Sequence, residues 1–224
     1  MGFLRRSRDV PTAWVLSGGG SLGAVQVGML RAMLAHGLRP DALLGTSAGA
    51  LNAAFMALEP TAARADELAE IWASLRRQDV FPIARWRNVF GLLSQKALID
   101  QRPLRQLIET RLGYVHIEEA SIPVVIVATD ADNGTEVRFT EGPVLPALLA
   151  STAIPGLLPA VEHEGRHLID GSVVSNTPIE AAVEMGFERI FVLPAAILRT
   201  PPAPRTAAAL ALHSLALAAR NQHE

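Results

Sequence analysis

Two short apolar segments, each followed at once by a glycine-rich turn and then by an apolar helical stretch, constrain the fold of this chain most. The first segment runs from Ala13 to Leu16 and enters the turn 17–23, and the second runs from Asp41 to Leu44 and enters the turn 45–49. Strands that lead into helices across short turns build parallel sheets with helices packed on them. We therefore predict an α/β fold with a mostly parallel central sheet.

The remainder of the chain supplies further strands and helices for such a fold. The apolar runs and turn signals predict strands at Val124–Ala128, Glu136–Thr140, Val161–His163, Arg166–Ile169 and Ile190–Leu193. Helices are predicted from Ala48 to Leu58, over most of 62–118 with a break near Pro82, at 144–152 and at 178–185. The helix after the first glycine turn carries Leu22, Val25, Met29 and Met33 at helical spacing and ends at Gly37.

Length and composition predict one domain with short additions at its end. A chain of 224 residues, half of them hydrophobic, is long enough to bury a substantial core. The predicted domain covers 11–194. A proline-rich linker follows at 195–206, and the alanine- and leucine-rich segment 207–224 is expected to form a helix that packs on or extends the same domain.

Charge and cysteine content exclude several classes of function. A net charge of −2 with both signs spread along the chain argues against nucleic acid as a partner. The absence of cysteine excludes disulfides, thiol nucleophiles and thiolate metal sites, and it allows a reducing cytoplasm, where we expect the protein to act. The N-terminus does not resemble a signal peptide, and the uncharged stretch 11–30 is interrupted by glycines, so no membrane span is predicted.

The sequence Gly45-Thr46-Ser47-Ala48-Gly49 allows two interpretations. In one, it is an ordinary turn from strand to helix, and Ser47 caps the helix. In the other, it is a nucleophile elbow, in which a serine on a tight turn exposes its hydroxyl for attack. Small flanking residues and the helix N-terminus that follows favour a developing alkoxide at Ser47.

The first glycine turn matches the dinucleotide fingerprint, Gly18-x-Gly20-x-x-Gly23. A dinucleotide site needs an acidic residue at the far end of the second strand, but Asp41 stands at the near end. Because neighbouring parallel strands end side by side, this turn would face Ser47, where its N–H groups would stabilise an oxyanion. A nucleotide-binding protein remains the alternative, as does a turn that only allows close packing.

A serine nucleophile also needs a base. None of the histidines lies in a glycine-rich turn after a strand; they are His36, His116, His163, His167, His213 and His223. Asp170 ends an apolar run and precedes Gly171, so its carboxylate would point into the same cleft, although an aspartate there also suits an ordinary turn. A Ser–Asp–His esterase acting on soluble esters, with His213 or His223 as the base, is the other possibility.

Taken together, these segments resemble the patatin-like phospholipase family. The resemblance rests on 18–23, 45–50, 92–108, 150–156 and 170–172. It implies a three-layer α/β/α sandwich, with 11–194 as the catalytic domain, that hydrolyses acyl esters of lipids or lysophospholipids. It assigns Ser47 as nucleophile, Asp170 as general base and the N–H groups of Gly18, Gly19 and Gly20 as the oxyanion hole, with Gly23, Gly45, Gly49 and Gly171 as supporting glycines. No metal and no cofactor is implied.

The sequence departs from this family at two positions. Leu22 stands where the family usually has arginine or lysine, which puts a preference for phospholipids in doubt. Ser172 follows Asp170-Gly171 where a glycine or alanine is usual, and this change adds little bulk.

The segment 81–90 mixes aromatic residues with arginines. Phe81, Trp86 and Phe90 alternate with Arg85 and Arg87. Aromatic rings and arginines suit the interface of an anionic membrane, so this segment predicts peripheral membrane contact. An ordinary buried bend between helices is the alternative.

Overall fold

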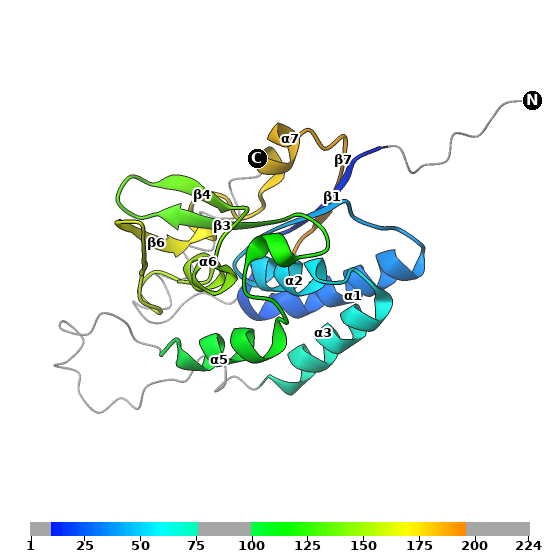
Figure 1. Cartoon of the computed structure of the whole chain (residues 1–224), viewed down its shortest axis with the longest axis horizontal. Helices are drawn as coiled ribbons and strands as arrows, with labels where there is room; N and C mark the ends of the chain where they lie inside the picture. The colour runs from blue at the N-terminus through cyan, green and yellow to red at the C-terminus, as the bar shows by residue number, and fades with distance from the viewer. Residues whose placement is uncertain (1–9, 76–99, 196–224) are drawn as a thin grey trace, which may run out of the picture.

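The computed structural model describes residues 10–75 and 100–195 (Figure 1). Its strands are β1 (Thr12–Leu16), β2 (Ala42–Thr46), β3 (Val124–Asp130), β4 (Thr135–Phe139), β5 (Val161–His163), β6 (Arg166–Asp170) and β7 (Arg189–Leu193). Its α-helices are α1 (Gly23–Ala35), α2 (Ala48–Ala57), α3 (Ala62–Ser74), α5 (Arg102–Arg111), α6 (Val144–Ser151) and α7 (Ile179–Glu184). Short 3-10 turns lie at Gly20–Leu22, Ile117–Glu119 and Gly171–Val173.

The seven strands form one sheet in the order β5-β6-β3-β2-β1-β7, with β4 also paired to β3. Strands β3, β2, β1 and β7 run parallel, whereas β4, β5 and β6 add antiparallel pairs at one side. Strand β3 is buried along its whole length, as expected for the centre of a sheet covered on both faces.

Alternate residues of the central strands contribute to two separate cores. Trp14 and Leu43 pack in the larger core with the helices below the sheet in Figure 1, whereas Val15 and Leu44 pack in the smaller one against α7. This alternation follows from the two-residue period of a strand. Helices on both faces of a mostly parallel sheet make the three-layer α/β/α sandwich that the sequence predicts.

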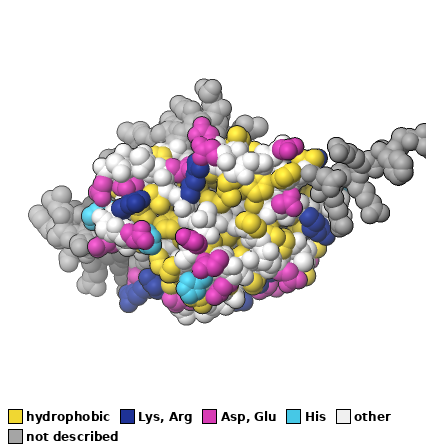
Figure 2. Space-filling model, turned by 45° about the horizontal axis from the view of Figure 1, so that its top comes forward, with side chains coloured by type: hydrophobic (Ala, Val, Ile, Leu, Met, Phe, Trp, Pro, Cys, Tyr) yellow, Lys and Arg dark blue, Asp and Glu magenta, His cyan; other side chains and the backbone are white. Residues whose placement is uncertain are grey.

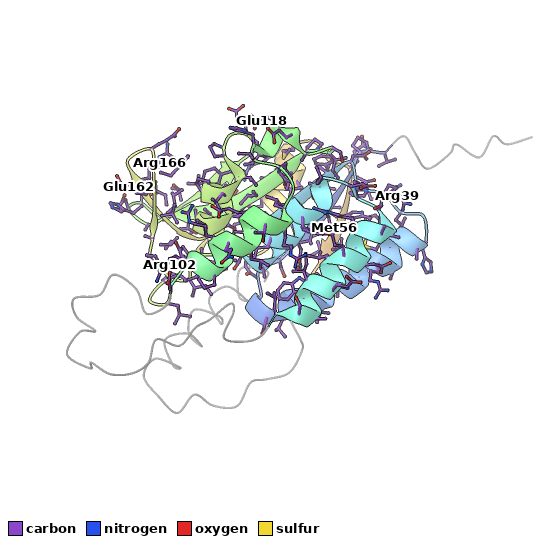
Figure 3. All side chains as sticks on the ribbon, turned by 60° about the horizontal axis from the view of Figure 1, so that its bottom comes forward. Arg39, Met56, Arg102, Glu118, Glu162 and Arg166 are labelled. Atoms are coloured by element: carbon purple, nitrogen blue, oxygen red, sulfur yellow. The ribbon has the colours of Figure 1, made fainter. Side chains whose placement is uncertain are left out.

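The larger helical layer buries apolar side chains and leaves charged ones at its edge. Figure 3 shows Met56, which is fully buried, within this layer, and the labelled side chains of Arg39 and Arg102 at its periphery. On the face shown in Figure 2, acidic, basic and apolar side chains are interspersed. Within the described residues, no helix is long and apolar enough to cross a membrane.

The predicted strands and helices in the described residues are present, but the prediction for α1 misplaces its buried face. The buried positions include Gln26, Val27, Leu30 and Leu34, while Val25 is 42% exposed. The reason is that α1 packs with a fully buried glutamine, which a search for apolar periodicity passes over. The segment 81–90 and, apart from Ala195, the predicted linker and final helix lie outside the described residues.

One edge of β3 receives two strands that run in opposite directions. Strand β2 pairs with the first half of β3 and ends with Thr46 opposite Val127. Strand β6 pairs with the second half and ends with Asp170 opposite Ala128. The C-terminal ends of β2 and β6 therefore meet on the same edge of β3, near its middle.

Candidate active site

Ser47 occupies a strained turn between β2 and α2. Its backbone has φ 54° and ψ −123°, a left-handed conformation that costs a non-glycine residue on the order of 1–3 kcal/mol. The flanking glycines are needed for close approach: a β-carbon on Gly45 would overlap the Gly49 carbonyl, and one on Gly49 would overlap the Leu16 carbonyl. The segment 45–49 therefore has the geometry of a nucleophile elbow.

The Ser47 side chain is directed at Asp170. Its Oγ donates a hydrogen bond of 2.7 Å to Oδ2 of Asp170, and the other carboxylate oxygen, Oδ1, accepts the Ser172 N–H at 2.8 Å. Asp170 is 1% exposed and Ser47 is 6% exposed. The two residues form the hydrogen-bonded pair that a serine nucleophile and its base require.

Burial raises the pKa of the Asp170 carboxyl above its usual value of 3.8. Hydrogen bonds from Ser47 and Ser172 act in the opposite direction, because they stabilise the carboxylate. Removal from water dominates, since the residue lies almost wholly inside the protein. A raised pKa makes Asp170 a stronger base than a carboxylate in water.

The backbone around Asp170 is fixed by hydrogen bonds on both sides. Its N–H donates to the Ala153 carbonyl at 2.9 Å, and its own carbonyl accepts the Thr129 hydroxyl at 2.9 Å. A β-carbon on Gly171 would overlap the Val127 carbonyl, so only glycine allows the chain to turn so close to β3. Asp170 thus has little freedom to move away from Ser47.

Ser151, at the end of α6, supports the elbow, and sequence reasoning gave it no role. Its hydroxyl accepts the Ser47 N–H at 2.9 Å and donates to the Val127 carbonyl at 2.6 Å. The side chain is fully buried. Ser151 falls within the segment 150–156, on which the family resemblance partly rests. That resemblance was the signal in the sequence that could have pointed to Ser151.

The first glycine turn lies beside Ser47, as predicted. A β-carbon on Gly18 would lie 3.3 Å from the Ser47 β-carbon. The Gly18 N–H, however, donates to the Asn176 carbonyl at 2.9 Å, so it is not free to bind an oxyanion. Within the described residues no acceptor is recorded for the N–H groups of Gly19 or Gly20. Of the three N–H groups predicted to bind an oxyanion, those of Gly19 and Gly20 therefore remain as candidates.

Ala48 offers a further backbone N–H beside Ser47, and the sequence prediction omitted it. It is the first residue of α2, so its N–H has no partner within the helix. The N–H of the residue after a nucleophilic serine commonly binds the oxyanion in elbow-type hydrolases. Ala48, Ser47 and Gly20 line one cavity.

This cavity has a volume of about 500 Å³ and is lined mainly by leucine, isoleucine and aromatic side chains. It is bounded by α2, α3, α5 and α6, which lie together on one side of the sheet in Figure 1. Of the described side chains that line it, Arg111 alone carries a charge. Ser47 therefore borders a space suited to a long apolar group.

Other predicted candidates are engaged elsewhere. The Asp41 carboxylate accepts the Thr12 N–H at 2.7 Å, at the opposite end of β2 from Ser47, so it has a structural partner and no place in a ribose site. The four histidines that the structure describes are absent from the described cavity lining; His213 and His223 lie outside the described residues. No cluster of possible metal ligands occurs among the described residues.

Known proteins are similar to this chain in sequence. An uncharacterised NTE family protein of Mycobacterium bovis is 30% identical over 176 residues, which cover 79% of this chain and 46% of that protein. Lysophospholipase NTE1 of Scheffersomyces stipitis is 28% identical over 195 residues, which cover 85% of this chain and 12% of that protein. The chain thus spans less than half the length of these relatives.

A solved structure shares the fold. VipD from Legionella pneumophila superposes with a TM-score of 0.54 at 15% sequence identity, covering 76% of this chain and 47% of that one. The family model described as patatin-like phospholipase matches residues 14–183, which include the elbow, Ser151 and Asp170. The chain belongs to the patatin-like phospholipase family.

Proposed function

We propose that this protein hydrolyses acyl esters of lipids with Ser47 as nucleophile and Asp170 as general base. The observation that carries the proposal is the 2.7 Å hydrogen bond from Ser47 to Asp170 beside an apolar cavity of about 500 Å³. An apolar cavity with a few convergent polar groups and a residue of perturbed pKa is typical of a substrate site.

In the first half of the reaction, the Ser47 oxygen attacks the acyl carbonyl carbon while its proton passes to Asp170. The negative charge on the carbonyl oxygen is stabilised by backbone N–H groups of Gly19, Gly20 and Ala48. Loss of one such donor costs roughly 10²–10³ in rate. Collapse of the intermediate expels the alcohol, which takes the proton from Asp170, and leaves the acyl group on Ser47.

In the second half, water attacks the acyl-enzyme. Asp170 accepts a proton from this water and returns it to the Ser47 oxygen as the fatty acid departs. No third side chain is required for proton transfer, because Asp170 contacts Ser47 directly. The raised pKa of Asp170 brings its proton affinity closer to that needed for both steps.

The lining of the cavity supports a substrate with a long acyl chain. Each methylene group moved from water into an apolar site contributes roughly 0.8 kcal/mol. The relative from Scheffersomyces stipitis is named a lysophospholipase, which supports a monoacyl phospholipid as the substrate. Leu22, two residues after Gly20, supplies no positive charge for a headgroup phosphate.

Labelling with a fluorophosphonate tests this function. The reagent should modify Ser47, and Ser47→Ala should abolish both labelling and ester hydrolysis in a folded protein. Ser121→Ala is the matched control, because this exposed hydroxyl bonds only to the Ala57 carbonyl and should leave labelling unchanged. Equal labelling of Ser47→Ala would refute the proposal.

A further inference from the structure

Two fully buried amide side chains, Gln26 on α1 and Asn52 on α2, form a chain of hydrogen bonds beneath the glycine turn. Gln26 Nε2 donates to the carbonyls of Ser17 and Leu193 at 2.8 and 2.9 Å. Asn52 Nδ2 donates to the Gly23 carbonyl at 3.0 Å and to Gln26 Oε1 at 2.9 Å. Both side chains are 0% exposed. Burial of two amides in a core of apolar side chains is costly unless they are bonded in this way.

These bonds hold both ends of the turn that carries the oxyanion donors. Ser17 precedes Gly18–Leu22 and Gly23 follows it, so Gln26 fixes the carbonyl before the turn and Asn52 fixes the carbonyl after it. The direct bond between the two amides ties these anchor points to each other. The positions of the Gly19 and Gly20 N–H groups therefore depend on this pair.

The chain of hydrogen bonds ends in the wall of the cavity. Trp72 Nε1, on α3, donates to Asn52 Oδ1 at 2.8 Å, and Trp72 lines the same cavity as Ser47. The indole also lies directly against the turn, since a β-carbon on Gly23 would come within 2.9 Å of Trp72 Cζ2. A group that fills the cavity thus touches a ring that is bonded to the support of the oxyanion site.

We propose that Gln26, Asn52 and Trp72 are positioning residues that couple an acyl chain in the cavity to the alignment of the Gly19 and Gly20 N–H groups. This inference rests on the proposed function. A chain long enough to reach Trp72 packs on the indole and keeps it bonded to Asn52, whereas a short acyl group leaves that wall without support. A long acyl chain thus contacts the state in which Trp72 is bonded to Asn52 more favourably than the state in which this bond is broken. A ligand shifts an equilibrium between two states only through such a difference in contacts. The effect therefore falls on kcat and depends on chain length.

Trp72→Phe tests the coupling, because it removes the N–H donor and keeps an aromatic wall. We would measure kcat and KM for p-nitrophenyl esters with acyl chains of increasing length from acetyl to palmitoyl. In the parent, kcat should rise with chain length. In Trp72→Phe, kcat for the long esters should fall about tenfold, the loss expected for one hydrogen bond. The fall in kcat for the acetyl ester should be clearly smaller, and KM should stay close to that of the parent.

Leu107→Ala is the matched control from the same cavity. Leu107 lines the cavity from α5 and makes no polar contact with the network. Its truncation should raise KM for the long esters and preserve the rise of kcat with chain length. If kcat of Leu107→Ala did not rise with acyl-chain length, removal of any side chain from the cavity wall would abolish the dependence on chain length. This result would overturn a specific role for the hydrogen bond from Trp72 to Asn52.

A measurement on the parent needs no variant that must fold. n-Octane can fill the apolar cavity while the acetyl ester reacts, so it should accelerate hydrolysis of p-nitrophenyl acetate by the parent. Inhibition or no effect would overturn the coupling, and so would equal losses of kcat at every chain length in Trp72→Phe. A parent enzyme that neither hydrolyses esters nor reacts with a fluorophosphonate would instead refute the proposed function.

Discussion

The Ser47 hydroxyl meets the Asp170 carboxylate because the strands that carry them end head to head on one edge of β3. Thr46 pairs with Val127 and Asp170 pairs with Ala128, so two consecutive residues of β3 define the ends of both strands. The hydrogen bond of 2.7 Å is thus set by backbone register. A base held by a strand end needs little reorganisation during the reaction, which is the condition for effective proton transfer.

Replacement of Asp170 by asparagine should lower kcat by a factor on the order of 10²–10⁴, the contribution of a positioned general base. The shape of the side chain is retained, but the proton acceptor is lost. The measurement is kcat on one soluble ester, with circular dichroism to confirm the fold. A decrease of less than about tenfold, below the contribution of a general base, would assign the base to another group.

Substitution of either C-terminal histidine separates a dyad from a triad. His213→Ala and His223→Ala should each keep kcat within a few-fold of the parent, since Asp170 contacts Ser47 without an intervening imidazole. In a triad, loss of the histidine costs about as much as loss of the serine. A collapse of kcat in either folded variant would contradict the dyad.

The pH profile should show an acid limb above the range of an ordinary aspartate. Only the unprotonated carboxylate accepts the Ser47 proton, so kcat/KM falls as pH drops through the raised pKa of Asp170. Ser172→Ala should move this limb to still higher pH, because it removes a side-chain hydrogen bond that lowers the pKa. A limb at or below 3.8 would show that Asp170 is not desolvated in solution.

The same burial predicts that Asp170 destabilises the folded protein at neutral pH. Its pKa is raised above 3.8 in the folded state. Between the two pKa values the folded state binds more protons than the unfolded chain, so the free energy of unfolding falls as pH rises through this window. Asp170→Asn removes the buried charge and should raise the thermal midpoint at pH 7 while lowering activity. A thermal midpoint of Asp170→Asn equal to or below that of the parent would show that the buried carboxylate does not destabilise the folded protein at pH 7.

The layers of the fold could be predicted from the sequence, and Ser47 and Asp170 could be singled out as candidates, because each has a local signal. Ser47 sits between glycines after an apolar run, and Asp170 ends another run before a glycine. Their pairing could not be derived from local pattern, since it depends on β6 joining the same edge of β3 as β2. The family resemblance supplied that link.

The buried polar support escaped prediction for a physical reason. Gln26, Asn52 and Ser151 are polar residues on helices, and such residues usually face water. Each is buried here because its hydrogen bonds are made to distant backbone groups or side chains, which leave no periodic trace in the sequence. The hydrogen bond from the Gly18 N–H to the Asn176 carbonyl likewise joins residues that are distant in the sequence, so it could be recognised only from the structure.

Ser151→Ala should impair catalysis by loosening the elbow. The substitution leaves the buried Ser47 N–H without its 2.9 Å partner, and an unsatisfied buried donor costs roughly 1–3 kcal/mol. We expect a thermal midpoint several degrees lower and kcat about tenfold lower, since a strained turn is less well held. Ser74→Ala, which removes another hydroxyl bonded to a backbone carbonyl, is the control and should keep kcat unchanged. Equal effects of the two variants would deny Ser151 a role at the site.

A pair of glycine substitutions tests the close packing at the elbow. Gly49→Ala places a β-carbon on the Leu16 carbonyl and should destabilise the protein by more than about 3 kcal/mol or prevent folding, since backbone at both sides must shift. Gly28→Ala, in the exposed part of α1, meets no atom within 4 Å and should stabilise by about 0.5–1 kcal/mol through helix propensity. Denaturant unfolding of both variants gives the comparison, and a Gly49→Ala protein as stable as the parent would show that the elbow is less tightly packed than described.

The segment 81–90, outside the described residues, carries the prediction of membrane contact. Replacement of Phe81, Trp86 and Phe90 by serine removes the aromatic groups that would enter a lipid interface and retains both arginines. We expect activity on anionic phospholipid vesicles to fall about tenfold or more, because loss of three interfacial rings removes several kcal/mol of membrane affinity. Hydrolysis of a soluble short-chain ester should change by less than about threefold, since Ser47 and Asp170 keep their support from β3.

Vesicle flotation of the parent and the triple variant measures binding directly. Similar losses on vesicles and on the soluble ester would identify the segment as part of the folded core, and unchanged flotation would refute membrane contact.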